Sequence, residues 1–246
     1  MERKLKVVVL AAGKGTRLQA GDSDAPKVMR HACGKPLLWH VLDALPVTRK
    51  EDIIIVVGYG KQQVISYFDG YQFAEQTEQL GTGHAVMAAK DLLSGFEGDV
   101  LVCYGDMPII KKETYEAFIN AHFKHENDCT ILTGESELPL PFGRIVRDAD
   151  GGFVRVVEDR DCNTEQLKIT ELNTGVYVFS APLLLEALKN LKSDNAQGEY
   201  YLTDVPEIML HTGAKIGLFK RKLGDEILGV NTVEQLEQVE EILGKR

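Results

Sequence analysis

Four short apolar runs alternate with helix-like segments along the first half of the chain, and this alternation restricts the fold more than any other feature. The runs are rich in β-branched residues, as buried strands are, and span residues 7–11, 53–57, 100–104 and 130–133. The helical segments between them span residues 36–45, 61–68, 83–93 and 112–124. This alternation predicts an α/β fold with a Rossmann-like, mainly parallel sheet flanked by helices.

The pattern changes after about residue 135. Residues 143–148 and 152–158 predict a hairpin around Asp148-Ala149-Asp150-Gly151, and residues 173–180 predict a further strand. Helical patterns return at 182–191, 202–211 and 233–243, with a strand at 215–220. We therefore expect a single domain over residues 1–246, with a small antiparallel lobe inserted at the sheet edge at about 135–180.

Composition excludes several functional classes. Hydrophobic residues make up 44% of the chain and charged residues 26%, as in an ordinary globular protein. The formal net charge of -9 gives no basic field to attract nucleic acid, so an anionic substrate must be met by local cations or a metal. Because the sequence has no apolar run of about 18 residues, we expect no membrane partner and a cytoplasmic location. The four scattered cysteines favour reduced thiols over disulfides or zinc ligands.

The segment LAAGKGTR, residues 10–17, follows the first predicted strand and partly matches two phosphate-binding motifs. Leu18 replaces the third glycine of a dinucleotide-binding fingerprint, and no glycine lies five residues before Gly15, as a P-loop requires. The small residues still allow phosphates to approach the backbone, although an ordinary strand-to-helix turn explains them equally simply. The cations nearby are Lys14, Arg17 and Lys27.

Two oxygen-bearing side chains lie in further loops. Asp106, in Tyr104-Gly105-Asp106-Met107-Pro108, follows a predicted strand, and Asn231 precedes the last predicted helix. Both offer oxygen ligands of the kind that Mg²⁺ prefers. Turn and helix capping are the simpler structural explanations for the same residue types.

The segment EQTEQLGTGHA, residues 75–85, combines two glutamines with a glycine turn and a predicted helix start. The amides of Gln76 and Gln79 both donate and accept hydrogen bonds, which suits a nucleobase edge. The backbone N–H groups of Gly81 and Thr82 are available for base carbonyls, although a polar capping loop has the same composition. His84 at the helix start is more often a packing or capping residue than a catalytic one.

Together these segments resemble the sugar-phosphate nucleotidyltransferases. The resemblance is closest to the N-terminal uridylyltransferase (pyrophosphorylase) domain family of the bacterial bifunctional N-acetylglucosamine-1-phosphate uridyltransferase/glucosamine-1-phosphate acetyltransferases. LAAG with the following Pro26-Lys27 marks only the superfamily. The other supporting segments are EQLGTGHA, YGDMP, FGRI at residues 142–145, ITELNTGVY at 169–177, NAQGEYYLTD at 195–204, and GVN at 229–231. Of these, EQLGTGHA, NTG and NAQGEYYLTD jointly make the more specific assignment.

The resemblance implies the nucleotide-diphospho-sugar transferase fold and a role for each matching residue. The catalytic contacts to the triphosphate would be Arg17 and Lys27. The UTP site would comprise Leu10, Ala11, Ala12, Gly13, Gln76, Gln79, Gly81, Thr82, Tyr104 and Gly105. The sugar site would comprise Gly143, Glu158, Asn173, Thr174, Tyr201 and Thr203, and the Mg²⁺ ligands would be Asp106 and Asn231.

The implied reaction transfers UMP from UTP to N-acetyl-α-D-glucosamine 1-phosphate, with Mg²⁺ as cofactor. Its products are pyrophosphate and UDP-N-acetylglucosamine, a precursor of cell-wall peptidoglycan. The alternatives are the same reaction on another sugar 1-phosphate and a catalytically silent nucleotide-sugar sensor. The presence of Arg17, Lys27, Asp106 and Asn231 together argues against a sensor, because binding alone does not need the whole charge-stabilising set.

The sequence departs from the family pattern in two places. Phe142 replaces the usual tyrosine before Gly-Arg, and Asp159-Arg160 replaces a common His-Lys pair, so the sugar is less firmly specified than nucleotidyl transfer. The sequence also ends at Arg246 without hexapeptide repeats, so we expect no C-terminal β-helix domain and no acetyltransferase activity. The oligomeric state stays open.

Overall fold

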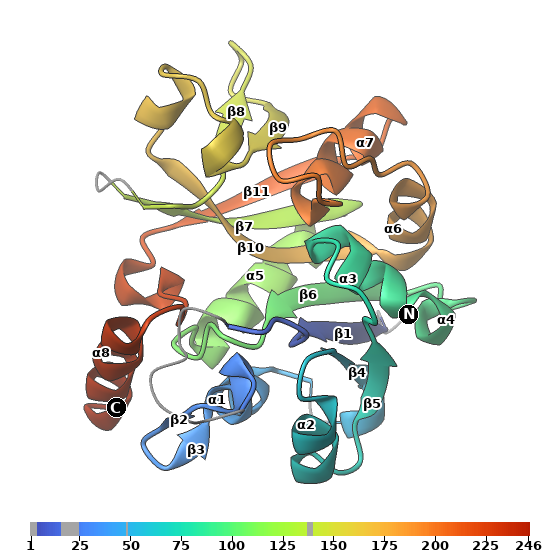
Figure 1. Cartoon of the computed structure of the whole chain (residues 1–246). Helices are drawn as coiled ribbons and strands as arrows, with labels where there is room; N and C mark the ends of the chain where they lie inside the picture. The colour runs from blue at the N-terminus through green and yellow to red at the C-terminus, as the bar shows by residue number, and fades with distance from the viewer. Residues whose placement is uncertain (1–3, 16–24, 48, 137–139) are drawn as a thin grey trace.

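A large mixed sheet forms the centre of the protein (Figure 1). The computed structural model describes residues 4–15, 25–47, 49–136 and 140–246. The central strand order is β11-β7-β10-β6-β1-β4-β5. Neighbouring strands among β1, β4, β5 and β6 pair in parallel, with bounds Leu5–Leu10, Ile53–Val57, Gln72–Glu75 and Asp99–Tyr104. This half of the sheet confirms the predicted α/β class.

The other half of the sheet mixes strand directions. β10 (Glu171–Ser180) lies antiparallel between β6 and β7 (Cys129–Glu135), and β11 (Ile216–Arg221) runs parallel to β7 at the edge. The predicted hairpin is present as β8 (Arg144–Arg147) and β9 (Phe153–Val157), and β8 pairs with the beginning of β10.

The strand expected to complete the lobe lies mostly in the central sheet. Nine of the ten residues of β10 are buried, as in a strand that is covered on both faces. The antiparallel lobe at about 135–180 therefore consists of β8, β9 and only the first part of β10.

Two sets of helices cover the two faces of the sheet. Along β1, Val7 and Val9 pack with one set while Val8 and Leu10 pack with the other, because successive side chains in a strand point to opposite faces. The first set comprises α1 (Leu37–Ala44), α2 (Lys61–Tyr67) and α5 (Lys112–His125). The second set comprises α3 (Thr82–Ala88), α4 (Lys90–Leu93), α6 (Ala181–Leu188) and α7 (Val205–His211).

Several short elements complete the fold. The last helix, α8 (Val233–Gly244), packs against the small hairpin of β2 (His31–Ala32) and β3 (Lys35–Pro36) through a separate apolar cluster around Val239. Short 3-10 helices span Lys27–Met29, Lys50–Asp52, Asp159–Asp161, Gln166–Lys168, Leu202–Asp204 and Gly224–Ile227.

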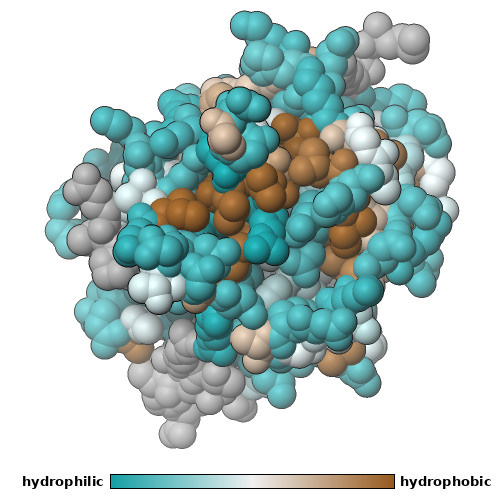
Figure 2. Space-filling model, turned by 90° about the horizontal axis from the view of Figure 1, so that it is seen from above, coloured by the Kyte–Doolittle hydropathy of each residue, from teal (hydrophilic) through white to brown (hydrophobic). Residues whose placement is uncertain are grey.

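The surface seen from above Figure 1 is mostly hydrophilic, with a band of apolar residues near its middle (Figure 2). Within the described ranges, no helix combines the length and the apolar character needed to span a membrane. The four cysteines are free thiols, and Cys103 and Cys129 are buried in strands of the central sheet.

The register of the parallel strands brings four loops together. Leu10 at the end of β1 lies opposite both Val56 of β4 and Tyr104 of β6, and Val57 lies opposite Glu75 of β5. The strands therefore end at one edge of the sheet, where ligands bind in open α/β folds. The loops that follow β1, β4, β5 and β6 emerge side by side at this edge.

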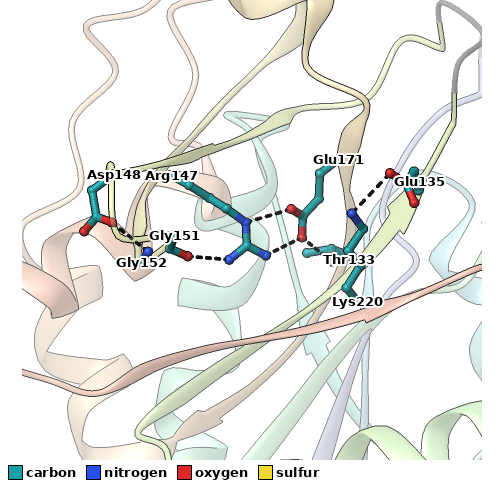
Figure 3. Close-up of polar contacts among 8 residues, drawn as sticks. All are labelled: Thr133, Glu135, Arg147, Asp148, Gly151, Gly152, Glu171 and Lys220. Carbon is teal, nitrogen blue, oxygen red and sulfur yellow. Dashed lines mark hydrogen bonds and ion pairs between the residues drawn. The ribbon is translucent and has the colours of Figure 1, made fainter.

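An ion pair between the partly exposed Arg147 and the buried carboxylate of Glu171 ties the β8–β9 hairpin to the central sheet (Figure 3). The Arg147 guanidinium donates from Nε and Nη2 to the two oxygens of Glu171, each at 2.8 Å, and from Nη1 to the Gly151 carbonyl at 2.6 Å. Thr133 of β7 donates to the same carboxylate at 2.8 Å. Burial raises the pKa of Glu171, but the hydrogen bonds from Arg147 and Thr133 outweigh it, so the pKa lies below 4.5.

Replacing Glu171 with Gln is expected to lower the free energy of unfolding at pH 7 by about 2 kcal/mol, because Arg147 loses its bidentate partner. The folded-state pKa lies below the ordinary value of 4.5, so the wild-type carboxylate contributes fully above that pH. The contribution is lost as the pH falls through the folded-state pKa, and the two proteins converge there. Urea unfolding at several pH values measures this difference.

Glu135→Gln is the matched control. Glu135 pairs with Lys220 at 3.2 Å in the same region, but both side chains are at least 40% exposed (Figure 3). An exposed pair contributes less than about 1 kcal/mol. Equal losses in the two variants would contradict the buried role of Glu171.

Candidate active site

A cavity of about 370 Å³ lies beyond the carboxyl ends of β1, β5 and β6. Its walls come from the loops that follow these strands and from three distant segments. The lining residues are Leu10, Ala11, Ala12, Gly13, Lys27, Val28, Gln76, Gln79, Gly81, Thr82, Ala85, Tyr104, Asp106, Glu199 and Asn231. This larger cavity brings together most of the residues that the sequence assigned to a nucleotide and a metal.

The turn that follows β5 is fixed by a segment more than 100 residues away. The Tyr200 backbone donates to the Leu80 carbonyl at 2.8 Å and accepts from the Gly83 N–H at 2.7 Å, while Thr82 Oγ1 accepts from the Leu202 N–H at 3.0 Å. Gly81 has a φ of 109°, and a Cβ there would lie 2.6 Å from the Tyr200 oxygen. Only glycine fits this position. The hydrogen bonds to the backbone of residues 200 and 202 therefore hold the turn in one conformation at the cavity wall.

Gln76 is the buried polar residue of the larger cavity. Only 4% of its surface is exposed, and its Nε2 donates to the Gly81 carbonyl at 3.0 Å. The same nitrogen lies 3.2 Å from Nδ1 of His84. The side chain is thus held by the turn that it helps to shape.

Lys27, Asp106 and Asn231 form a charged cluster at the cavity wall. The Lys27 ammonium pairs with the Asp106 carboxylate and donates to Asn231 Oδ1 at 3.0 Å. The Lys27 and Asp106 side chains are only 14% and 15% exposed. A Cβ on Gly15, whose φ is 65°, would lie 2.6 Å from Lys27 Cβ, so the glycine loop runs directly against this lysine.

Backbone contacts position Asn231 in this cluster. The Val230 N–H donates to the Asp106 carbonyl at 2.9 Å, which joins the two loops. Gln235 Oε1 accepts from the N–H groups of Asn231 at 2.7 Å and Thr232 at 3.1 Å, as part of the capping box that begins α8. Asn231 itself is the residue before the N-cap, so its side chain is not used for capping and remains directed to Lys27.

A second cavity, of about 170 Å³, adjoins the first. Tyr104, Asp106 and Asn231 line both cavities. The other residues of the smaller cavity are Met107, Pro141, Phe142, Gly143, Glu158, Asn173, Thr174, Gly175 and Gly229. The charged cluster therefore lies at the junction between two binding spaces.

A bulge in β10 shapes the wall of the smaller cavity. The pairing of β10 with β7 shifts register between Asn173 and Tyr177. Asn173 Oδ1 accepts from the Gly175 N–H at 3.1 Å, and Asn173 Nδ2 donates to the Tyr177 hydroxyl at 2.7 Å. Thr174 donates to the Leu132 carbonyl at 2.8 Å. Bulges often redirect side chains beside active sites, and this one is held by its own side chains.

Gly175 lets the Tyr104 ring pack against the bulge. Its φ is 79°, and a Cβ there would lie 2.3 Å from Cε2 of Tyr104. Burial raises the pKa of the Tyr104 phenol, and the nearby Glu158 and Asp106 carboxylates raise it further, so the ring stays neutral between the cavities. Burial also raises the pKa of Glu158, with Asp204 and Asp161 adding to the effect.

Gly175→Ala is expected to lower the free energy of unfolding by about 2 kcal/mol more than Gly213→Ala. Both glycines have a similar positive φ, 79° and 88°, but a Cβ at Gly213 meets no atom within 4 Å. Gly213→Ala measures the cost of about 1–2 kcal/mol of placing alanine at a positive φ. The additional loss in Gly175→Ala measures the cost of the steric clash with Tyr104. Equal losses in chemical denaturation would show that the ring moves aside without cost.

Several sequence-predicted residues lie elsewhere. Gly105, Tyr201 and Thr203 do not line either cavity. The Tyr201 hydroxyl accepts from Gln197 at 2.9 Å and donates to Asp161 at 3.3 Å, so it holds the turn after Glu158. Arg17 is outside the described residues.

Sequence reasoning missed two contributors to the larger cavity. Glu199 lines it directly, and His84 contacts Gln76. The only sequence signal for Glu199 was the motif NAQGEYYLTD, which includes it. No periodicity in the sequence distinguishes His84 from an ordinary helix residue.

The oxygens of Asp106 and Asn231 fit a divalent cation. Both oxygens contact the Lys27 ammonium, so they converge on one position that a positive charge occupies. A carboxylate and an amide oxygen are hard ligands, and Mg²⁺ in nucleotide sites takes one or two such protein ligands together with substrate phosphates. Across the described ranges no cluster of three or more His, Cys, Asp or Glu residues could hold a metal ion.

The fold and the two joined cavities define a class of protein. A parallel sheet with a glycine loop, a cation and a paired carboxylate and amide at its carboxyl edge is typical of domains that bind nucleoside phosphates. Residues 7–204 match the family of MobA-like NTP transferase domains, and the chain belongs to this family.

Curated relatives are similar over nearly the whole chain. The bifunctional protein GlmU of Streptococcus suis is 44% identical over 240 residues, which cover 97% of this chain. Bifunctional GlmU proteins of Lactobacillus johnsonii and Pelotomaculum thermopropionicum are 45% and 41% identical, each over 98% of it. The match covers 52% of each relative, so the chain spans about half of their length.

A solved structure supports the fold independently. A Bacillus anthracis protein assigned as a glucose-1-phosphate thymidylyltransferase, in complex with sucrose, superposes with a TM-score of 0.76. The superposition covers 97% of this chain and 95% of the other at 18% sequence identity. At that identity the likeness concerns the fold alone.

Proposed function

We propose that the chain transfers UMP from UTP to N-acetyl-α-D-glucosamine 1-phosphate and releases pyrophosphate. The observation that carries this proposal is the junction of two cavities at Tyr104, Asp106 and Asn231, with Lys27 beside it. A reaction between two substrates needs two binding spaces that meet where the bond forms. The similarity to the GlmU proteins supports the choice of substrates.

The nucleotide occupies the larger cavity in this proposal. Gln76, Gln79, Gly81 and Thr82 contact the base, and residues 10–13 admit the phosphates to the backbone. The sugar occupies the smaller cavity. Its walls include Gly143, Glu158, Asn173 and Thr174, while Tyr201 supports the turn after Glu158 from outside the cavity.

The chemistry is an in-line displacement at the α-phosphorus of UTP. A phosphate oxygen of the sugar 1-phosphate forms the new P–O bond as the bond to pyrophosphate breaks. This nucleophile is already an anion, so no general base is needed, and the remaining task is to hold two anions together. Lys27 supplies a positive charge at the junction, and we assign the same task to Arg17 from the sequence resemblance.

The proposed Mg²⁺ is held by Asp106 and Asn231. When bound there, the ion would supply positive charge to the phosphoryl oxygens and help to orient the phosphates of the nucleotide. Lys27 contacts the same two residues, so its ammonium is free to shift toward the phosphates when the cation binds. Because nucleotides and sugar phosphates are metabolites of the cytoplasm, we place the chain there.

Lys27→Ala is expected to lower kcat for pyrophosphate release by about 100-fold or more, as for other preorganised charge stabilisers. Asp106→Ala is expected to abolish the Mg²⁺-dependent rate. Lys220→Ala is the matched control, because Lys220 makes an exposed pair with Glu135 and lines neither cavity. Normal Mg²⁺-dependent activity in Asp106→Ala would refute the metal assignment.

A substrate panel separates the remaining alternatives. We expect the highest kcat/KM with UTP and N-acetylglucosamine 1-phosphate among combinations of UTP, CTP, GTP and dTTP with several sugar 1-phosphates. Phe142, which replaces the usual tyrosine, lines the smaller cavity. A higher kcat/KM with another sugar 1-phosphate would identify that sugar as the substrate of this cavity. Binding of UDP-N-acetylglucosamine without any pyrophosphate release would instead identify a nucleotide-sugar sensor.

A further inference from the structure

The orientation of the Gln76 amide is fixed by its neighbours. The Gly81 carbonyl can only accept, so the amide atom that faces it at 3.0 Å must be the NH₂ group. The second neighbour of this nitrogen is His84 Nδ1, at 3.2 Å. A hydrogen bond between them requires Nδ1 to accept, which places the imidazole proton on Nε2.

This arrangement leaves one free group on the Gln76 side chain. Both amide hydrogens are directed at protein acceptors, Gly81 and His84. The oxygen Oε1 has no hydrogen-bond donor among the residues that the structure describes, and Gln76 lines the larger cavity. The side chain therefore offers a ligand an acceptor and no donor.

The His84 ring is held in place independently of Gln76. It packs beside the Tyr200 ring, with centroids 6.4 Å apart and planes inclined by 32°. The Tyr200 backbone is the same one that holds Leu80 and Gly83. His84 is thus a rigid acceptor at the start of α3 rather than a side chain that adapts to Gln76.

We propose that His84 is a positioning residue that determines base preference by fixing the Gln76 amide. This inference rests on the proposed nucleotide site. Uracil and cytosine differ at the base edge: uracil has N3–H and O4, whereas cytosine has N3 and an N4 amino group, so donor and acceptor are exchanged. An amide that can turn over can present its oxygen to N3–H of uracil or its NH₂ group to N3 of cytosine. The fixed Gln76 amide presents only its oxygen, which suits uracil.

The His84→Phe variant tests the proposal. Phenylalanine keeps a ring beside Tyr200 but removes the Nδ1 acceptor, so turning the amide over then costs one hydrogen bond, to Gly81, instead of two. The preference for UTP over CTP is expected to fall about tenfold, which corresponds to the loss of one hydrogen bond. His84→Asn can return an acceptor near the Nδ1 position and is expected to retain most of the preference.

The readout is the UTP to CTP ratio of kcat/KM, together with the ratio of Kd values for the two nucleotides. A merely structural role for His84 would weaken both nucleotides equally and leave both ratios unchanged, which would overturn the proposal. If wild-type protein binds nucleotides but releases no pyrophosphate, the proposed transfer fails and the Kd ratio still decides the role of His84. Protein that binds neither nucleotide would overturn both.

The tautomer of His84 can be measured in the wild-type protein, so this second test does not depend on whether a variant folds. Nitrogen-15 NMR of the wild-type protein is expected to show the tautomer of the imidazole that carries its proton on Nε2. A proton on Nδ1 would point a donor at the Gln76 NH₂ group and would overturn the proposal.

Discussion

The contact of Lys27 with Asp106 and Asn231 organises the whole candidate site. It joins three segments of the chain, and Lys27 and Asn231 are 204 residues apart in the sequence. The Val230 to Asp106 backbone bond and the capping box of α8 hold the far loop at the junction. Because Asp106 and Asn231 line both cavities, the position of this cluster determines where the two cavities meet.

The cluster also explains how an acidic chain could bind the polyanions of the proposed reaction. With a net charge of -9 the protein has no long-range attraction for phosphates, so positive charge must be concentrated locally. Lys27 is mostly buried and paired, which places its positive charge at the junction before any ligand arrives. A charge that the protein itself holds at the reacting centre stabilises the charge that develops in a transition state. The neutral Tyr104 ring packs against the bulge at Gly175, where the two cavities adjoin.

The sequence predicted the features that arise from local pattern. The strand at 53–57 was predicted with its observed bounds because all five of its residues are buried apolar residues. The site edge followed from parallel topology, and the family resemblance implied that Asp106 and Asn231 bind Mg²⁺. The position of β10 between β6 and β7 was not predicted, because it results from pairing between strands that are separated in the sequence. β5 was missed because it is four residues long and only Ala74 is buried.

Other details of the site depend on contacts that no sequence pattern contains. The hydrogen bond between Gln76 and His84 depends on how the turn at Gly81 is held by Tyr200. Tyr201 matched a sugar-site motif, yet its hydroxyl is directed to Asp161 because the 195–204 segment folds back onto that turn. Motif residues therefore divide into those that line a cavity and those that hold its walls, and only the three-dimensional structure separates them.

We propose that the two cavities are the two halves of one site, joined at the charged cluster. A crystal structure of the chain with UDP-N-acetylglucosamine and Mg²⁺ tests this arrangement. We expect uracil beside Gln76, the sugar between Glu158 and Asn173, and the diphosphate passing Lys27 and Asp106. A product bound with base and sugar in a single cavity, or with its diphosphate away from Lys27 and Asp106, would contradict it.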